Sequence, residues 1–317
     1  MRNHLATKFY AASLNYRDIA ISREYPLGHY GGIVSGSDGS GLVVSIGSLI
    51  TSFKVGDKVL TTYNQAHLSG SLTLATVKNG TGGRSDGALA EYVVFNETGL
   101  VAMPKSPTWE EAATLLVASV TAWNALYGLE GRRLKVWDFV LTQGTRGTSI
   151  IALLLAVAAG ATVIATTSSK RKAVKLKALG ATHVINYKSD SNWGDTVRLI
   201  IRGTGVDHVI EVGGPTSMAQ SLKAIKIDRV INLIGFLGGF KDPNEPSYFQ
   251  TLFSLCTVRG LLCGSKVQFE ELNCVIDNRG IKPAYDDKVF TLRETKEAYR
   301  FLADQKHFAK VVIKIAE

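Results

Sequence analysis

The sequence has few cysteines, and they lie close together. Cys256, Cys263 and Cys274 are the only three in 317 residues. Three thiols in one short segment do not make the disulfide framework of a secreted protein, and their spacing lacks the close CxxC pairs of a structural zinc site. We interpret them as buried or incidental thiols.

Long apolar runs are also absent. No run of uncharged, apolar residues reaches the roughly 18 that a transmembrane helix needs. The start, MRNHLATKFYAAS, has no apolar core followed by a cleavage site, as a signal peptide would. We therefore expect a soluble protein of the cytoplasm.

Charge of one sign dominates only weakly. The 36 Lys and Arg exceed the 27 Asp and Glu, which gives a net charge of +9. Such an excess can attract nucleic acid, an anionic membrane or a phosphorylated small molecule. The charge is spread along the chain without an aromatic-interleaved basic run, so nucleic acid is not expected as the main partner. A small-molecule substrate is the expectation.

The pattern of apolar runs predicts two kinds of structure. The stretch GLVVSIGSLITSFKVGDKVLTTY is typical of short strands separated by glycine turns, which predicts an antiparallel β domain. From Asp138 onward, apolar strands alternate with helices that end at glycines, which predicts a doubly wound α/β unit with a parallel sheet. The end of the chain predicts two helices and a last strand that returns to the first domain. The expected domains are 1–117, 118–265 and 266–317.

A glycine-containing turn follows the first strand of this α/β unit. In QGTRGTS, Gly144 and Gly147 allow backbone N–H groups and a helix N-terminus to approach a pyrophosphate. Arg146 stands at a position of the turn where glycine is usual, so its guanidinium either adds a phosphate contact or obstructs the site. After the second strand, TTSSKRK supplies hydroxyls and cations where an NAD site places an acid. This composition favours the 2′-phosphate of NADP(H).

These blocks together resemble the medium-chain dehydrogenase/reductases, in particular their zinc-independent quinone and enoyl reductase-like branch. The resemblance rests on AASLNYRDIAI, GSDGSGLVVSIGSLITSFKVGDKV, GALAEYVVF, ASVTAWNALYG, QGTRGTS, KALGATHVINY, VDHVIEVGG and NLIGFLGG. It implies a GroES-like catalytic domain and a Rossmann domain, with NADP(H) in the cleft between them. Relatives commonly dimerise through the Rossmann sheet edge, so the resemblance also suggests that this protein forms a homodimer.

The resemblance implies roles for individual residues. Gly144 and Gly147, with Arg146 between them, match the pyrophosphate turn. The positions that match contacts with the 2′-phosphate and adenosine are Ser168, Lys172 and Tyr187. The positions that match the lining of the nicotinamide site are Thr121, Gly213, Ile234 and Gly235.

The first domain departs from the zinc-using relatives. Where they hold the catalytic metal with a cysteine and a Gly-His-Glu segment, this chain has Asn15 and Ser37-Asp38. An amide, a hydroxyl and one carboxylate make a poor zinc site, so no metal is expected. The start is also shorter than in relatives by one or two strands, from which we expect an exposed sheet edge and reduced stability.

Without zinc, hydride transfer from NADPH suits a conjugated acceptor, such as an enone, quinone or enoyl group. Tyr25 matches the tyrosine acid of some relatives and is preferred over Tyr16 as the proton donor. Asn15 is expected to hydrogen-bond the substrate or the nicotinamide ribose. Two alternatives stay open: a non-catalytic NADPH-binding sensor or structural protein, and an alcohol or aldehyde oxidoreductase. A serine hydrolase is disfavoured, because Ser85 lies in a glycine-rich loop that leads into a strand.

Overall fold

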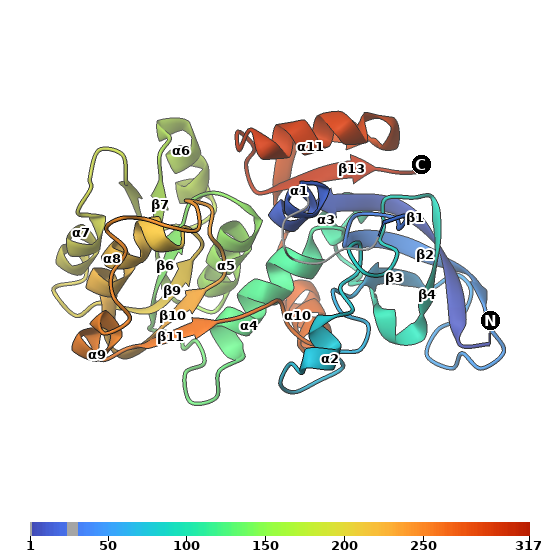
Figure 1. The fold of residues 1–317 in the computed structure, drawn as a ribbon, viewed down its shortest axis with the longest axis horizontal. Helices are drawn as coiled ribbons and strands as arrows, with labels where there is room; N and C mark the ends of the chain where they lie inside the picture. Colours follow the sequence, from blue (N-terminus) through green and yellow to red (C-terminus); the bar gives the residue numbers. More distant parts are fainter. Residues whose placement is uncertain (1, 24–30) are drawn as a thin grey trace. The chain divides into compact units, whose positions relative to one another are not determined.

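The computed structural model describes residues 2–23 and 31–317. The chain divides into two compact units (Figure 1). Unit 1 comprises Met1–Val120 and Cys263–Glu317, and unit 2 comprises Thr121–Leu262. The C-terminal part of the chain therefore returns to the unit that the N-terminal part forms.

Unit 1 is built on a seven-stranded sheet with the order β12-β13-β1-β2-β3-β5, in which β4 also pairs with β1. Its strands are β1 (His4–Leu14), β2 (Asp38–Ile46), β3 (Lys58–Thr61), β4 (Tyr92–Asn96), β5 (Leu100–Ala102), β12 (Tyr285–Thr291) and β13 (Lys310–Lys314). Its helices are α1 (Tyr16–Ser22), α2 (Leu74–Val77), α3 (Trp109–Ala112), α10 (Lys266–Arg279) and α11 (Thr295–Ala303), with the short helical segments η1 (Glu97–Gly99), η2 (Leu115–Val120) and η3 (Leu292–Glu294).

The first strand is interior to this sheet. Residues His4–Lys8 of β1 pair with β4, residues Ala11–Leu14 pair with β13, and β2 pairs along most of β1. The exposed edge that we expect from the short start therefore does not lie at β1. The C-terminal prediction was incomplete, because this segment supplies two strands: β12 pairs in parallel with β13.

Unit 2 contains the predicted doubly wound parallel sheet, in the order β11-β10-β9-β6-β7-β8. Every neighbouring pair is parallel. The strands are β6 (Phe139–Gln143), β7 (Thr162–Thr167), β8 (His183–Asn186), β9 (Val206–Glu211), β10 (Ile225–Leu233) and β11 (Thr257–Gly260). The helices are α4 (Thr121–Tyr127), α5 (Gly147–Ala158), α6 (Lys170–Ala178), α7 (Trp193–Ile200), α8 (Pro215–Ala224) and α9 (Gln250–Ser254).

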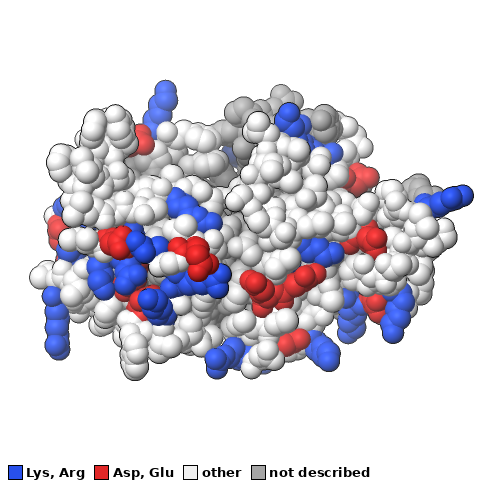
Figure 2. All heavy atoms as spheres, turned by 90° about the horizontal axis from the view of Figure 1, so that it is seen from below, with Lys and Arg blue, Asp and Glu red and all other residues white. Residues whose placement is uncertain are grey.

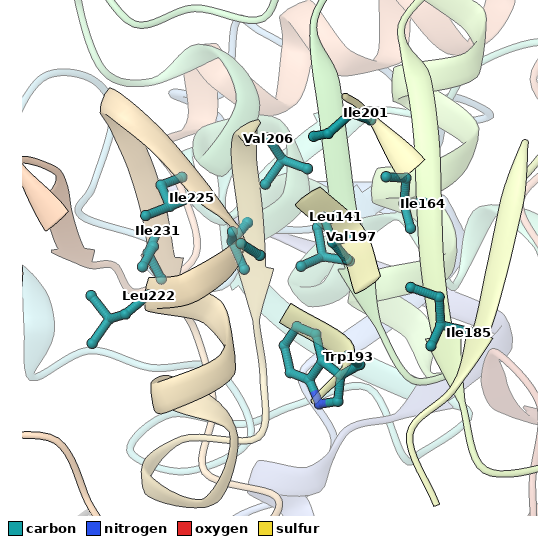
Figure 3. Packing of buried hydrophobic residues seen from close by; sticks show 12 residues of the cluster. Leu141, Ile164, Ile185, Trp193, Val197, Ile201, Val206, Leu222, Ile225 and Ile231 are labelled. Carbon is teal, nitrogen blue, oxygen red and sulfur yellow. The ribbon is translucent and has the colours of Figure 1, made fainter. Parts of the chain in front are cut away.

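One hydrophobic core of unit 2 lies between the sheet and helices α7 and α8. Leu141, Val209 and Ile231 occupy one register row across β6, β9 and β10. Trp193 and Val197 of α7 pack in the same cluster (Figure 3). Strands that are buried on both faces read as continuous apolar runs, which is why the sequence pattern predicted a parallel sheet here.

The surface carries both signs of charge. On the face drawn in Figure 2, Lys and Arg side chains stand among Asp and Glu side chains. Among the residues that the structure describes, no helix is both long enough and apolar enough to cross a bilayer.

Candidate functional site

The strand order of unit 2 reverses between β6 and β9. From β6 the chain adds β7 and β8 on one side, and it then returns to add β9, β10 and β11 on the other. In open parallel sheets, ligands bind outside the carboxyl ends of the strands at such a switch point. The loops after β6 and β9 are therefore the candidate ligand-binding loops of unit 2.

The loop after β6 is the predicted glycine turn. Gly144 has a φ of +72°, and a Cβ built there would meet no atom within 4 Å. This position both requires a glycine-like backbone and faces open space. Arg146, the residue before α5, has a φ of −100°, which any residue adopts. An arginine therefore replaces the usual glycine without backbone strain.

The loop after β7 leads into a helix with an unusual first turn. Helix α6 begins with Lys170, Arg171 and Lys172 and has no acidic residue in its first turn. Cations are unfavourable at a helix N-terminus, by roughly 0.3–1 kcal/mol each. Ser169 caps the helix by accepting a hydrogen bond from the N–H of Lys172 at 3.3 Å. This basic first turn lowers the stability of α6 and places positive charge beside hydroxyl groups.

The loops after β9 and β10 are hydrogen-bonded to each other. The N–H of Leu237 donates to the carbonyl of Val212 at 2.9 Å, and the N–H of Gly238 donates to that of Gly213 at 3.0 Å. A Cβ on Gly213 would stand 2.2 Å from the Ser217 hydroxyl. Glycine at position 213 is therefore required by the close approach of Ser217, in the first turn of α8.

Parallel strand direction brings the predicted nucleotide residues of unit 2 to one edge of the sheet. The predicted residues that follow strands β6, β7, β8, β9 and β10 are Gly144, Arg146, Gly147, Ser168, Lys172, Tyr187, Gly213, Ile234 and Gly235. Thr121 differs, because it is buried at the first position of α4. Tyr187 is 42% exposed, as a residue at a ligand-accessible edge can be.

In unit 1, the residues at the expected metal position surround a buried lysine. The Lys310 ammonium at the start of β13 donates to Asn15 Oδ1 at 2.5 Å and to Asp38 Oδ2 at 3.0 Å. Asn15 Nδ2 donates to the Ser37 hydroxyl at 3.3 Å, and that hydroxyl donates to Asp38 Oδ1 at 2.7 Å. Ser13 donates to Asp38 Oδ2 at 3.3 Å. These contacts orient the amide of Asn15 with its oxygen toward Lys310 and its nitrogen toward Ser37.

This donor set does not fit zinc. Asp38 already has a cation 3.0 Å away, and a dication placed there would be repelled by the ammonium of Lys310. The remaining donors are an amide and hydroxyls, which bind zinc poorly. Among the described residues, no three His, Cys, Asp or Glu side chains gather as metal ligands.

A buried carboxyl lies beside this cluster. Asp18 accepts a hydrogen bond from the N–H of Asn15 at 2.7 Å and thereby helps to begin α1. Burial raises the pKa of Asp18 to about 6, although the Arg17 guanidinium lowers it. The pKa of Asp18 therefore lies closer to neutral pH than the pKa of an exposed aspartate.

The two predicted tyrosines have different outcomes. Tyr16 is the first residue of α1, adjacent to Asn15. Tyr25 lies outside the described residues.

The loop that contains Ser85 leads into β4 and not into a helix, so it lacks the strand, turn and helix of a hydrolase nucleophile.

Three functional candidates were missed by sequence reasoning. Lys310, Gln143 and Glu211 are all buried and polar. The available signal for Gln143 and Glu211 was a polar side chain at the last position of a strand that leads into a glycine-containing loop. Lys310 gave no local signal, because its partners stand at the other end of the sequence.

Two family models and several known proteins match this chain along most of its length. Residues 2–105 match the alcohol dehydrogenase GroES-like domain, and residues 147–278 match the zinc-binding dehydrogenase domain. A zinc-type alcohol dehydrogenase-like protein of Schizosaccharomyces pombe is 40% identical over 311 residues, covering 97% of this chain and 90% of its own. A quinone oxidoreductase-like protein 2 homolog of Nematostella vectensis is 30% identical over 292 residues, covering 88% and 73%.

A solved structure gives the same result. A Sinorhizobium meliloti 1021 protein described as an alcohol dehydrogenase aligns with a TM-score of 0.91 at 36% identity, covering 99% of this chain and 91% of that one. Fold and sequence therefore point to the same family.

The raised pKa of Asp18 predicts a specific pH dependence of stability. The folded state keeps the proton up to about pH 6, whereas the unfolded chain releases it near the ordinary value of 3.8. The free energy of unfolding therefore falls as the pH rises through this window. Between about pH 4.5 and about pH 7.5, wild type should lose roughly 2 kcal/mol more than Asp18→Asn, measured by urea unfolding. The asparagine can still accept from Asn15, and equal pH dependence of both proteins would contradict the prediction.

Proposed function

Because the chain belongs to the medium-chain dehydrogenase/reductase family of oxidoreductases, we propose that it is an NADPH-dependent, zinc-independent member. Its proposed acceptor is a conjugated carbonyl, a quinone or an enoyl group, and its proposed location is the cytoplasm. One observation carries the proposal: the Lys310 ammonium holds Asn15 and Asp38 together, where metal-using relatives would need free ligands.

The carboxyl-end edge of unit 2 is the proposed nucleotide site. Gly144, Gly147 and the N-terminus of α5 would hold the pyrophosphate, since Gly144 faces open space and α5 is a twelve-residue helix. Arg146 at the start of α5 would add a phosphate contact. Gly213, Ile234, Gly235 and Thr121 would line the nicotinamide. When bound there, NADPH supplies the hydride.

The basic first turn of α6 supports NADPH over NADH. A 2′-phosphate would be met by Ser168, Lys172 and Tyr187 and would relieve the repulsion between the helix N-terminus and its cations. An acid that would bind free ribose hydroxyls is missing from TTSSKRK.

In unit 1, Asn15 is the proposed contact for the acceptor oxygen. Its amide oxygen is taken by Lys310, so the amide presents N–H groups, of which one reaches Ser37. An N–H donor stabilises negative charge that develops on a conjugated carbonyl when a hydride adds to its β-carbon. Tyr25 is the proposed proton donor, with Tyr16 as the second candidate.

We expect turnover of NADPH with at least one conjugated acceptor, and we expect it to persist with a chelator. The assay follows NADPH absorbance with quinones, enones, enoyl thioesters and aldehydes. Asn15→Ala should lower kcat at least about tenfold, because it removes an N–H donor to the developing charge. Ser85→Ala, the matched control, should leave kcat unchanged.

The other outcomes of this assay separate the alternatives. Tight NADPH binding without turnover on any acceptor would favour a sensor or structural protein. Turnover with aldehydes alone would favour an alcohol or aldehyde oxidoreductase. One firmly bound zinc per chain, found by metal analysis, would refute the zinc-independent mechanism.

The cofactor preference has its own test. Lys172→Ala should raise the Kd for NADPH about tenfold and leave the Kd for NADH unchanged, because only NADPH carries the 2′-phosphate. Lys177→Ala, in the last turn of the same helix, is the control and should change neither. Equal weakening of both nucleotides by Lys172→Ala would speak against the 2′-phosphate contact.

A homodimer through unit 2 is also proposed. Strand β11 is an end strand of its sheet, with β10 as its neighbour. Several apolar side chains nearby in sequence are exposed, among them Leu252 at 61% and Phe253 at 75%. A sheet edge flanked by exposed apolar side chains is suited to association with a second copy.

Light scattering after gel filtration tests the dimer. We expect twice the 34.2 kDa of one chain for wild type. Phe253→Asp should shift the protein towards the monomer, because it places a charge in an apolar contact. Val174→Asp, at a side chain that is 69% exposed on α6, should leave the mass unchanged. A wild-type monomer at all concentrations would exclude the dimer.

A further inference from the structure

Two buried polar side chains stand at the point where the strand order of unit 2 reverses. Gln143 ends β6 and is 5% exposed, and Glu211 ends β9 and is 0% exposed. Their side chains meet: Gln143 Nε2 donates to Glu211 Oε2 at 2.7 Å. They therefore join the two strands whose loops form the switch point.

Glu211 accepts hydrogen bonds from five donors. Its Oε1 accepts from the N–H of Gly213 at 2.8 Å, the N–H of Gly214 at 3.0 Å and the Ser217 hydroxyl at 2.5 Å. Its Oε2 accepts from Gln143 and from the Ser221 hydroxyl. A group that meets only donors is suited to be an ionised carboxylate, whose oxygens can only accept.

The carboxylate of Glu211 also lies at the beginning of a helix. Gly214 is the residue before α8, a ten-residue helix, and its N–H points to Glu211. The positive end of the helix dipole favours an anion there. The chain's own carboxylate thus fills this anion site, so α8 does not compete with α5 for the phosphates of a ligand.

Gln143 connects this carboxylate to both loops. Its Oε1 accepts from the N–H of Val212 at 3.2 Å, within the loop after β9. Its backbone carbonyl accepts from the Ser149 hydroxyl at 2.5 Å, within the first turn of α5. Gln143 thus ties the first turn of α5 to the loop that contains Gly213, through its backbone carbonyl on one side and its side-chain amide on the other.

We propose that Glu211, oriented by Gln143, is a positioning residue that holds loop 212–214 in the conformation required by the nicotinamide half of the cofactor. This inference rests on the proposed function for the identity of the cofactor. The loop itself makes its hydrogen bonds to Glu211 through backbone N–H groups, which a substitution of the loop side chains would not remove. Glu211→Gln keeps the shape but places an amide group among five donors, where at least one donor loses its acceptor.

The test compares Glu211→Gln with Val209→Ala, a substitution that destabilises the same strand through a core cavity without touching the loop. We expect Glu211→Gln to raise the Kd for NADPH at least about tenfold and that for 2′-phospho-ADP-ribose, which lacks nicotinamide, less than about threefold. In Val209→Ala, the Kd for NADPH and the Kd for 2′-phospho-ADP-ribose should change by the same factor relative to wild type. Equal weakening of both ligands by Glu211→Gln, or the same pattern in Val209→Ala, would overturn the proposal.

Amide hydrogen exchange of the free protein decides the question independently of nucleotide binding. In Glu211→Gln, exchange at residues 212–214 should accelerate at least about tenfold relative to the rest of unit 2, whereas Val209→Ala should show no such local excess. Unchanged exchange at these residues would overturn the proposal. If wild type binds neither nucleotide, the proposed function fails, while the exchange result still tests whether Glu211 holds the loop.

Discussion

The parallel pairing of β6 with β9 is the constraint on which the candidate site depends. Leu141 and Val209 are 68 positions apart in the sequence, yet they share one register row. Because both strands run in the same direction, a glycine turn and a glycine loop emerge side by side at one edge. The apolar residues of this row fix the register, and the polar residues that follow, Gln143 and Glu211, fix the loops.

A second buried polar group organises unit 1. The ion pair between Lys310 and Asp38 joins the last strand of the chain to the second one and crosses 272 positions of sequence. Removing one partner of such a pair is strongly destabilising, because it leaves an uncompensated buried charge. The pair therefore ties the C-terminal segment to this unit and also sets the orientation of Asn15. In both units, a buried charge positions groups that are proposed to bind ligand.

The sequence predicted those features that local pattern encodes. Alternation of apolar strands and helices, with glycines at their ends, was enough to predict the parallel sheet and the loops at its carboxyl edge. Strand β12 was missed because YDDKVFT carries charges at positions that a strand with one buried face would fill with apolar residues. The role of Glu211 could not be predicted, since its partners depend on the side-by-side packing of β6, β9 and α8. The backbone conformation at Arg146 could likewise not be predicted from the sequence, because only the backbone angles show that glycine is not needed there.

Above all, we propose that the edge of unit 2 at β6 and β9 binds NADPH. A crystal structure of the protein with NADPH measures this directly. We predict the pyrophosphate against the turn at Gly144–Gly147 and the N-terminus of α5, with the 2′-phosphate beside Ser168 and Lys172. Crystals grown with saturating NADPH that show no nucleotide at this edge, or show its pyrophosphate at another place, would contradict the claim.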